Sequence, residues 1–245
     1  AADLRPVVDE FGGADWTGYA QIALIVETML KREQAIALYT KGGFESDTAA
    51  AAGWELFTTL RDAKLFADDT PGLDMAGMNT EFYGGKAAMV HGGSWSYSEC
   101  PLELAPDVQL AGFPLPNGSP HPKPIIMAGF AAKGVWITRN GTKKIDAAGK
   151  FVQFLYQGEM MARFAEESSM PLPIKGVQVD ESKLHPLFAQ SLQFTDDMVT
   201  MMPAGQGLVP GTVRPTFLNI AKEAYGSLTA SEIIDQLAEA YKAAE

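Results

Sequence analysis

The sequence predicts an α/β protein, because short strand-like runs alternate along it with longer helical runs. Residues Ala87 to His91 and Val108 to Phe113 are short, apolar-rich runs bounded by glycine or proline, as strands are. Longer runs, of which Lys144 to Gln157 is an example, repeat apolar residues at helical spacing. Strands interspersed with longer helices are typical of α/β architectures. With 245 residues the chain can form one large or two small domains and bury a real core.

The first third of the chain is predicted to be mainly helical. A glycine-bearing turn around Gly12 and Trp16 precedes a helix from Thr17 to Lys31 with a broad apolar side. Asp47 is placed to cap a second helix, and Trp54 lies on the apolar side of that helix. We therefore expect Trp54 in the core.

The middle of the chain contains the predicted strands. A short helix from Met78 to Phe82 leads into the strand that ends at His91. The Val108–Phe113 strand ends at a proline-rich turn. Residues Ile125 to Ile137 are predicted to form a buried strand broken by two glycines, in which Trp136 could face either way.

The last part of the chain is predicted to be helical. Thr229 and Glu232 have the spacing of a capping box, in which each side chain binds an unpaired backbone amide of the other. The prolines Pro171 and Pro173 would stop the helix that precedes them. Five helices are expected here: 144–157, 159–167, 184–193, 213–225 and 229–243.

Charge and composition exclude several partners. The 19 Lys and Arg residues against 30 Asp and Glu residues give a net charge of −11, which disfavours nucleic acid and anionic lipid surfaces. No apolar stretch reaches transmembrane length. The single cysteine, Cys100, excludes an internal disulfide and fits either a cytoplasmic or a bacterial exported protein.

The N-terminal sequence predicts an internal start. Residues Ala1 to Val8 contain no initiator methionine and no signal-peptide pattern, and they pass almost at once into an apolar strand-like segment.

Catalytic motifs are incomplete. Gly92 to Ser96 lacks the final glycine of a nucleophile elbow. A catalytic triad of Ser94 with His121 or His185 is therefore an alternative for which the sequence contains only part of the motif. Cys100 has only His91 nearby in sequence as a base. We therefore predict a binding protein and not an enzyme.

Metal and cofactor motifs are also incomplete. The three histidines are widely spaced, and Asp68, Asp69 and Asp74 miss the spacing of a calcium loop. The glycines between Gly205 and Gly211 match neither a dinucleotide fingerprint nor a phosphate-binding loop. We expect no metal and no cofactor.

Two tryptophans follow glycine-bearing turns, which tend to expose a ring at the end of an element. These are Trp16 and Trp95. Sugars stack a C–H face on such rings while their hydroxyls exchange hydrogen bonds with polar side chains. Both residues are therefore candidate ligand platforms.

The residues Phe82-Tyr83-Gly84-Gly85-Lys86-Ala87-Ala88-Met89 with Gly93-Ser94-Trp95 form the most specific motif of the chain, "F-x-x-G-K-A-A-M…G-S-W". Further motifs are Gly12 to Trp16, Gly112 to Pro116, the 138–155 region and Ser169 to Pro173. Taken together, and in this order along the chain, these segments resemble bacterial extracellular solute-binding proteins, the sugar-capturing subunits of ABC importers.

The resemblance implies a two-lobe periplasmic-binding-protein fold of type II, the Venus-flytrap arrangement. By position, residues 1–125 and 182–245 would belong to the C-terminal lobe, and 126–181 would be the hinge crossing and the returning part of the N-terminal lobe. The candidate ligand-binding residues are Trp95 as the platform, with Trp16, Ser94, Gly93, Arg214 and Met170. Arg214 could instead form a surface ion pair.

The resemblance also implies a function: extracytoplasmic binding of a mono- or oligosaccharide for delivery to an ABC permease. The protein would be a monomer in the periplasm or anchored to the cell surface as a lipoprotein. Family members carry a further N-terminal stretch, so we expect a missing N-terminal segment of the same protein. The alternatives are an α/β hydrolase-like enzyme using Ser94 and a sensor that reuses the binding-protein fold.

Overall fold

The computed structural model describes residues 4–12, 15–127, 135–170, 172, 174–194, 197–201 and 207–244, with the backbone alone at 15–17 and 194. The chain divides into two compact units. The first comprises Ala1–His91, Ala111–Gly129 and Thr195–Glu245, and the second comprises Gly92–Leu110 and Phe130–Phe194. Thus Gly92–Leu110 and residues 182–194 group with the second unit. The assignment of segments to the two lobes of the family stays a prediction.

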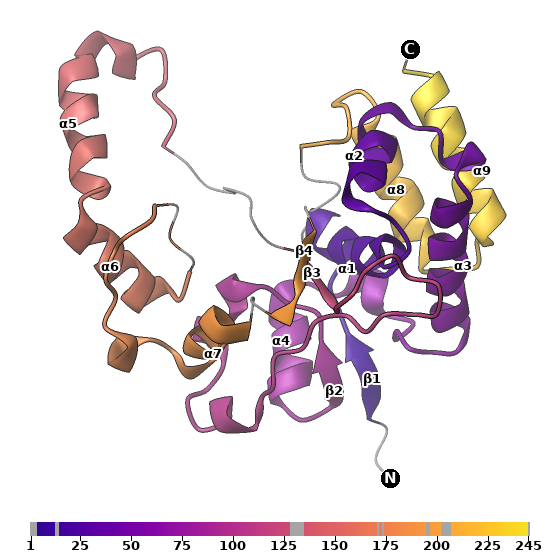
Figure 1. Ribbon diagram of the computed structural model, residues 1–245, viewed down its shortest axis with the longest axis horizontal. Helices are drawn as coiled ribbons and strands as arrows, with labels where there is room; N and C mark the ends of the chain where they lie inside the picture. Colours follow the sequence, from indigo (N-terminus) through magenta and orange to yellow (C-terminus); the bar gives the residue numbers. More distant parts are fainter. Residues whose placement is uncertain are drawn as a thin grey trace. The chain divides into compact units, whose positions relative to one another are not determined.

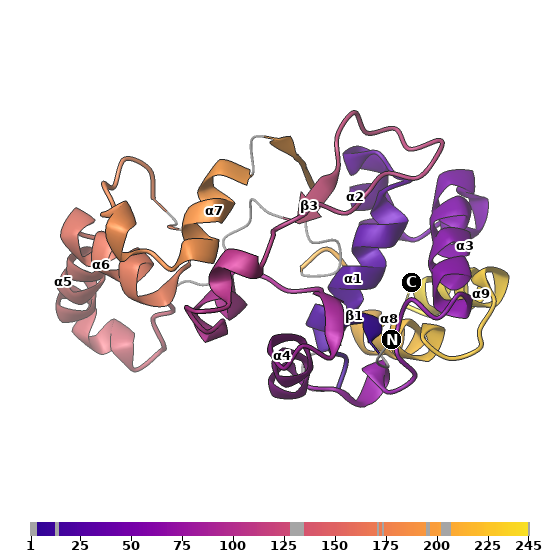
Figure 2. The same ribbon diagram turned by 90° about the horizontal axis from the view of Figure 1, so that it is seen from below.

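The first unit contains two small parallel sheets and most of the helices (Figure 1). Strand β1 (Arg5–Val8) pairs with β2 (Ala87–Val90), and β3 (Ile125–Met127) pairs with β4 (Val199–Met201). Its helices are α1 (Asp15–Glu27), α2 (Arg32–Lys41), α3 (Thr48–Asp62), α4 (Met75–Tyr83), α8 (Arg214–Ala224) and α9 (Ala230–Lys242). Both views place α4 beside β2, against which it packs (Figures 1 and 2).

The second unit is helical in the part of the chain that the structure describes. Its elements are the 3₁₀ helices η3 (Ser94–Glu99) and η4 (Ala105–Asp107), then η5 (Gly141–Lys144), α5 (Ile145–Leu155), α6 (Gly158–Ser168), η6 (Glu181–Lys183) and α7 (Pro186–Phe194). Its small core joins Ala165 of α6, Leu184 and Phe188.

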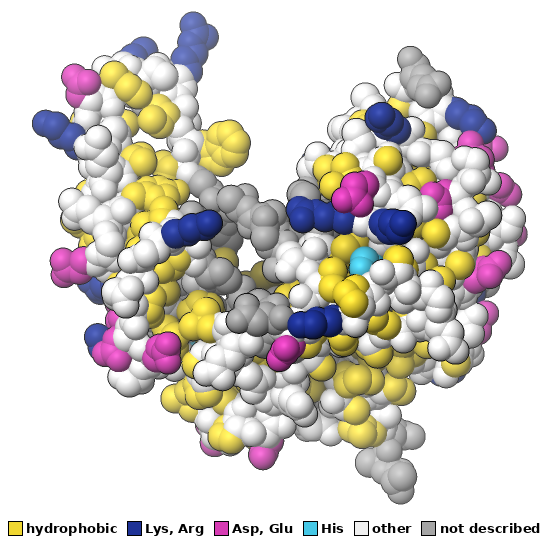
Figure 3. Space-filling view, in the orientation of Figure 1, with side chains coloured by type: hydrophobic (Ala, Val, Ile, Leu, Met, Phe, Trp, Pro, Cys, Tyr) yellow, Lys and Arg dark blue, Asp and Glu magenta, His cyan; other side chains and the backbone are white. Residues whose placement is uncertain are grey.

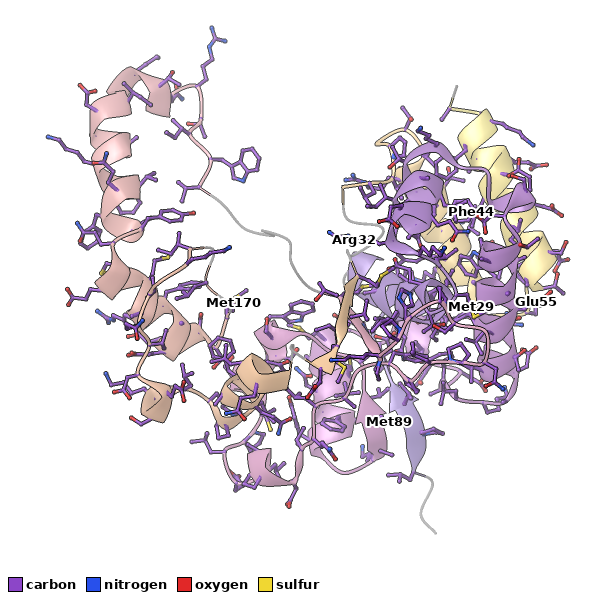
Figure 4. All side chains as sticks on the ribbon, viewed as in Figure 1. Met29, Arg32, Phe44, Glu55, Met89 and Met170 are labelled. Carbon is purple, nitrogen blue, oxygen red and sulfur yellow. The ribbon has the colours of Figure 1, made fainter. Side chains whose placement is uncertain are left out.

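The core of the first unit contains a cluster of aromatic rings, one of which, Phe44, is labelled in Figure 4. Phe217 of α8 meets Tyr19 edge-on at 4.9 Å between ring centroids and Tyr39 at 5.9 Å. The Tyr19 hydroxyl donates to that of Tyr39 at 2.7 Å, so the buried phenols satisfy each other. Trp54 is fully buried, as predicted.

Arg61 links helix α3 to the C-terminal end of α8. Its buried guanidinium donates through Nη1 to the carbonyl oxygens of Ala224 at 2.8 Å and Leu228 at 2.7 Å. These acceptors are 163 and 167 residues away in sequence. Because a helix leaves its last carbonyls without helical partners, the arginine provides a donor for Ala224 at the end of α8, and it also binds the Leu228 carbonyl in the loop that follows.

Two strand predictions were wrong. Residues 108–112 form no strand, and only Phe113 makes an isolated bridge, to Ile125. Of the described residues in the predicted buried strand Ile125–Ile137, Ile125–Met127 form a strand, whereas the last three lie outside any strand and are exposed, with Trp136 at 90%. The residues between, 128–134, lie outside the described part of the chain. Apolar alternation without a strand partner does not make a strand.

The capping predictions were confirmed and give a stability test. The carboxylate of Asp47 accepts from the backbone amides of Ala49 and Ala50, both at 2.9 Å. We expect Asp47→Ala to lower the free energy of unfolding by about 1 kcal/mol, because two amides of α3 lose their acceptor. Urea unfolding followed by circular dichroism measures this. The control is Glu55→Ala, an exposed carboxylate on the same helix (Figure 4), and an equal loss in both variants would contradict the prediction.

Candidate functional site

The segment after β2 presents a tryptophan, as the sequence predicted. Trp95 lies in the first turn of η3, and its side chain is 42% exposed. Gly93 precedes the helix with an extended backbone, and its carbonyl accepts from the amide of Ser96 at 2.9 Å. Ser94 is half-buried at the first position of η3. The segment therefore holds Gly93, Ser94 and Trp95 together and leaves part of the indole exposed to solvent.

The indole of Trp95 packs back onto Gly93. A Cβ atom at Gly93 would overlap the six-membered ring of Trp95, whereas one at Gly92 would meet only Ser96 Oγ, at 4.0 Å. Gly93 has an ordinary extended φ of −124°, which any residue can adopt. The position therefore requires glycine because of the indole ring and not because of the backbone conformation.

This contact yields a matched pair of variants. We expect Gly93→Ala to displace the indole and Gly92→Ala to leave it in place, because only the first adds a methyl group where the ring lies. The measurement is acrylamide quenching of the Trp95 fluorescence in a background where the other tryptophans are phenylalanine. Equal quenching in both variants would show that Gly93 does not position the ring.

The other predicted site residues lie in both units. Arg214 begins α8 in the first unit, where its Nη2 donates to the carbonyl of Val209 at 3.4 Å. Trp16 lies in the first turn of α1, and its side chain is outside the described part of the structure. Met170 follows α6 in the second unit and is half-buried (Figure 4). The structure groups only Gly93, Ser94 and Trp95 in one segment.

The two histidines named in the hydrolase alternative contact backbone groups. Both ring nitrogens of His185 are engaged by backbone, Nε2 with the Cys100 carbonyl at 3.0 Å and Nδ1 with the Leu187 amide at 3.3 Å. His121 Nε2 lies 3.0 Å from the Glu27 carbonyl. Burial raises the pKa of the Cys100 thiol, which disfavours the reactive thiolate.

A buried polar cluster lies at the carboxyl ends of β1 and β2. Asp9 is fully buried; its Oδ1 accepts from the Glu10 amide at 2.8 Å and lies 3.2 Å from His91 Nδ1. Its Oδ2 accepts from the Tyr225 hydroxyl at 3.0 Å. Since the carboxylate fixes Nδ1, the Nε2 atom of His91 is the nitrogen that can exchange a hydrogen bond with another group. No pattern in the sequence had indicated this cluster.

A hollow of about 580 Å³ lies between α8 and α9, and none of the predicted site residues whose side chains are described lines it. Its walls include Thr216, Asn219, Gln236 and Glu239. Among the described residues, no group of three or more histidine, cysteine or carboxylate side chains could hold a metal ion. No described helix is both long and apolar enough to cross a membrane.

The chain matches a known protein family. The sequence profile of the family described as "Bacterial extracellular solute-binding protein" matches residues 10–190, which is well over half of the 245 residues. The chain belongs to this family. The extracytoplasmic location predicted from the resemblance is thereby confirmed. No curated protein sequence matches this solute-binding protein.

Solved structures confirm the α/β periplasmic-binding-protein fold. A "probable secreted solute-binding lipoprotein" from Streptomyces coelicolor is 28% identical, with a TM-score of 0.79 over 98% of this chain and 59% of that one. A chitin oligosaccharide binding protein is 20% identical with a TM-score of 0.79, over 99% of this chain and 60% of its own. A solute-binding protein in complex with raffinose is 17% identical with a TM-score of 0.64, over 98% and 61%. This solute-binding protein therefore spans about three-fifths of the length of those chains.

Proposed function

We propose that this protein binds a mono- or oligosaccharide outside the cytoplasm and delivers it to an ABC permease. The observation that carries the proposal is the Trp95 indole, which is 42% exposed and held against Gly93. A positioned aromatic face suits the C–H face of a sugar ring. The matches to a chitin oligosaccharide binding protein and to a raffinose complex support a carbohydrate ligand.

Within this proposal, Trp95 is the stacking platform. The backbone of Gly93 and the hydroxyl of Ser94 lie in the same segment and would contact the same ligand. Trp16, Arg214 and Met170 remain proposed ligand contacts on the resemblance alone. The protein would act by binding without turnover, as the binding proteins that it resembles do.

We further propose that the protein is a monomer and that a segment of it precedes these residues. The preceding segment is supported by the match to 98% of this chain but only 59% of the Streptomyces coelicolor chain, and the monomer rests on the resemblance alone. Mass spectrometry of the protein isolated from its source tests this directly. An intact mass equal to the 26.3 kDa of these residues, together with cooperative unfolding, would contradict it.

The proposed function is tested by titration with a panel of mono- and oligosaccharides, followed by tryptophan fluorescence. Both the 245-residue chain and the protein isolated from its source are titrated. We expect saturable binding of at least one sugar by the isolated protein, without change in the sugar. If no sugar on the panel binds to either form, the carbohydrate assignment is wrong. Release of a product would instead identify an enzyme.

A further inference from the structure

Asp9 and His91 lie side by side just beyond the ends of β1 and β2 in the first unit. The two strands pair in parallel as far as Val8 and Val90, and the His91 amide then donates to the Val8 carbonyl at 3.2 Å. One further residue on each strand therefore places Asp9 beside His91. In open α/β sheets, ligands bind outside the carboxyl ends of parallel strands, which is where this pair lies.

The Asp9 carboxylate is a buried acceptor with three donors. Its side chain is fully buried, and it accepts from the Glu10 amide at 2.8 Å and from the Tyr225 hydroxyl at 3.0 Å. Burial, together with Asp9, raises the pKa of the Tyr225 hydroxyl well above its ordinary value, so this group stays protonated and donates. The third partner is His91 Nδ1, which lies 3.2 Å from Oδ1. Because a carboxylate only accepts hydrogen bonds, Nδ1 is the ring nitrogen that carries the proton.

The contact with Asp9 leaves the second ring nitrogen of His91 available. With the proton on Nδ1, the Nε2 atom of the neutral imidazole is an acceptor. Within the described part of the chain, no group is hydrogen-bonded to Nε2. The side chain is 12% exposed, so packing and Asp9 fix the ring while a small part of it remains accessible. A ligand hydroxyl would therefore meet an acceptor that needs no reorientation.

We infer that His91 is a ligand-binding residue of the first unit, whose Nε2 atom accepts a hydrogen bond from a hydroxyl group of the bound sugar. Asp9 is a positioning residue, which fixes the ring and its tautomer without touching the ligand. The inference rests on the proposed function, because the hydroxyl that donates is that of a sugar. His91 is four residues before Trp95, so one short stretch of sequence would supply an acceptor and a stacking ring.

Two substitutions of His91 separate ligand binding from the contact with Asp9. The amide group of asparagine can take the place of Nδ1 and donate to Asp9, but it leaves nothing at the position of Nε2. The longer glutamine can place its amide oxygen, an acceptor, near the position of Nε2. We therefore expect His91→Asn to unfold at the same urea concentration as the unsubstituted protein but to bind sugar about tenfold more weakly. His91→Gln should recover part of the affinity.

Calorimetry on the protein as its source produces it, and on variants of that protein, tests the inference. The probes are N,N′-diacetylchitobiose, raffinose, maltose and xylobiose. His121→Asn removes another imidazole of the first unit and should leave the affinity unchanged. Equal affinities of His91→Asn and the unsubstituted protein would overturn the inference and leave the proposed function standing. No binding of any probe to the unsubstituted protein would overturn both.

Nitrogen NMR of the imidazole rings decides the question if a variant fails to fold. The 245 residues contain three histidines, and little of the surface visible in Figure 3 is histidine, so few imidazoles can respond to an added sugar. At a pH of about 8, where an unperturbed imidazole is neutral, we expect Nε2 of His91 to be the unprotonated nitrogen. Its resonance should shift when a probe that binds is added. A proton on Nε2, or a resonance that the bound sugar leaves unchanged, would overturn the inference.

Discussion

Replacing Trp95 by alanine is expected to weaken sugar binding by about 30-fold or more. Truncating a tryptophan that anchors an interface typically costs about 2 kcal/mol or more, and about 1.4 kcal/mol corresponds to a tenfold change in the dissociation constant. The indole is already held against Gly93, so little ordering is needed on binding. Isothermal titration calorimetry with a sugar that binds the unsubstituted protein measures the effect.

The Trp95→Ala experiment has two controls. Leu102→Ala removes another exposed apolar side chain of the second unit and should leave the affinity unchanged. Trp95→Phe keeps a smaller ring and should retain part of the affinity. An unchanged dissociation constant in Trp95→Ala, with sugar still bound, would show that the platform lies elsewhere.

Replacing Glu27 by glutamine is expected to remove a large pH dependence of stability. Glu27 ends helix α1, and neither carboxylate oxygen has a hydrogen-bond partner among the described residues. Burial raises the pKa of this carboxyl well above its ordinary 4.5. When the pH is above that ordinary pKa, the Glu27 carboxyl of the unfolded chain loses its proton while that of the folded chain keeps it. Folding stability therefore falls as pH rises, until the folded-state carboxyl itself ionises.

The size of the Glu27 effect follows from the same linkage. Each pH unit within that window lowers the free energy of unfolding by about 1.4 kcal/mol in the unsubstituted protein and not in Glu27→Gln. Urea unfolding at several pH values between about 5 and 8 measures both curves. Glu33→Gln, at an exposed carboxylate of α2, is the control and should follow the unsubstituted protein. Parallel curves for Glu27→Gln and the unsubstituted protein would show that Glu27 does not stay protonated on folding.

The sequence predicted the elements that are specified locally. Helix α3 begins at the predicted cap Asp47, and α9 begins at the predicted capping box of Thr229 and Glu232. Such signals use residues two or three apart, which a reader of the sequence can see. The strand predicted at Val108–Phe113 failed because pairing depends on a distant partner that the local pattern does not specify.

The same difference between local and distant contacts explains which residues of the candidate site could be predicted. Trp95 was predicted because the glycines that present it are its neighbours in sequence. Asp9 and His91 were not, because 82 residues separate them and only the pairing of β1 with β2 brings their ends together. Tyr225, which donates to the same carboxylate, is 216 residues from Asp9. No local pattern indicates a hydrogen bond of that span.

The hydrogen bonds of Arg61 constrain the order in which the first unit can fold. Its acceptors at Ala224 and Leu228 belong to the third of the segments that build the first unit. During synthesis, the early helices must therefore wait for α8 and α9 before their common core can close. Contacts of such long separation slow folding and leave apolar surface exposed in the meantime. The nascent chain would thus remain open, and accessible to chaperones, until α8 and α9 have been made.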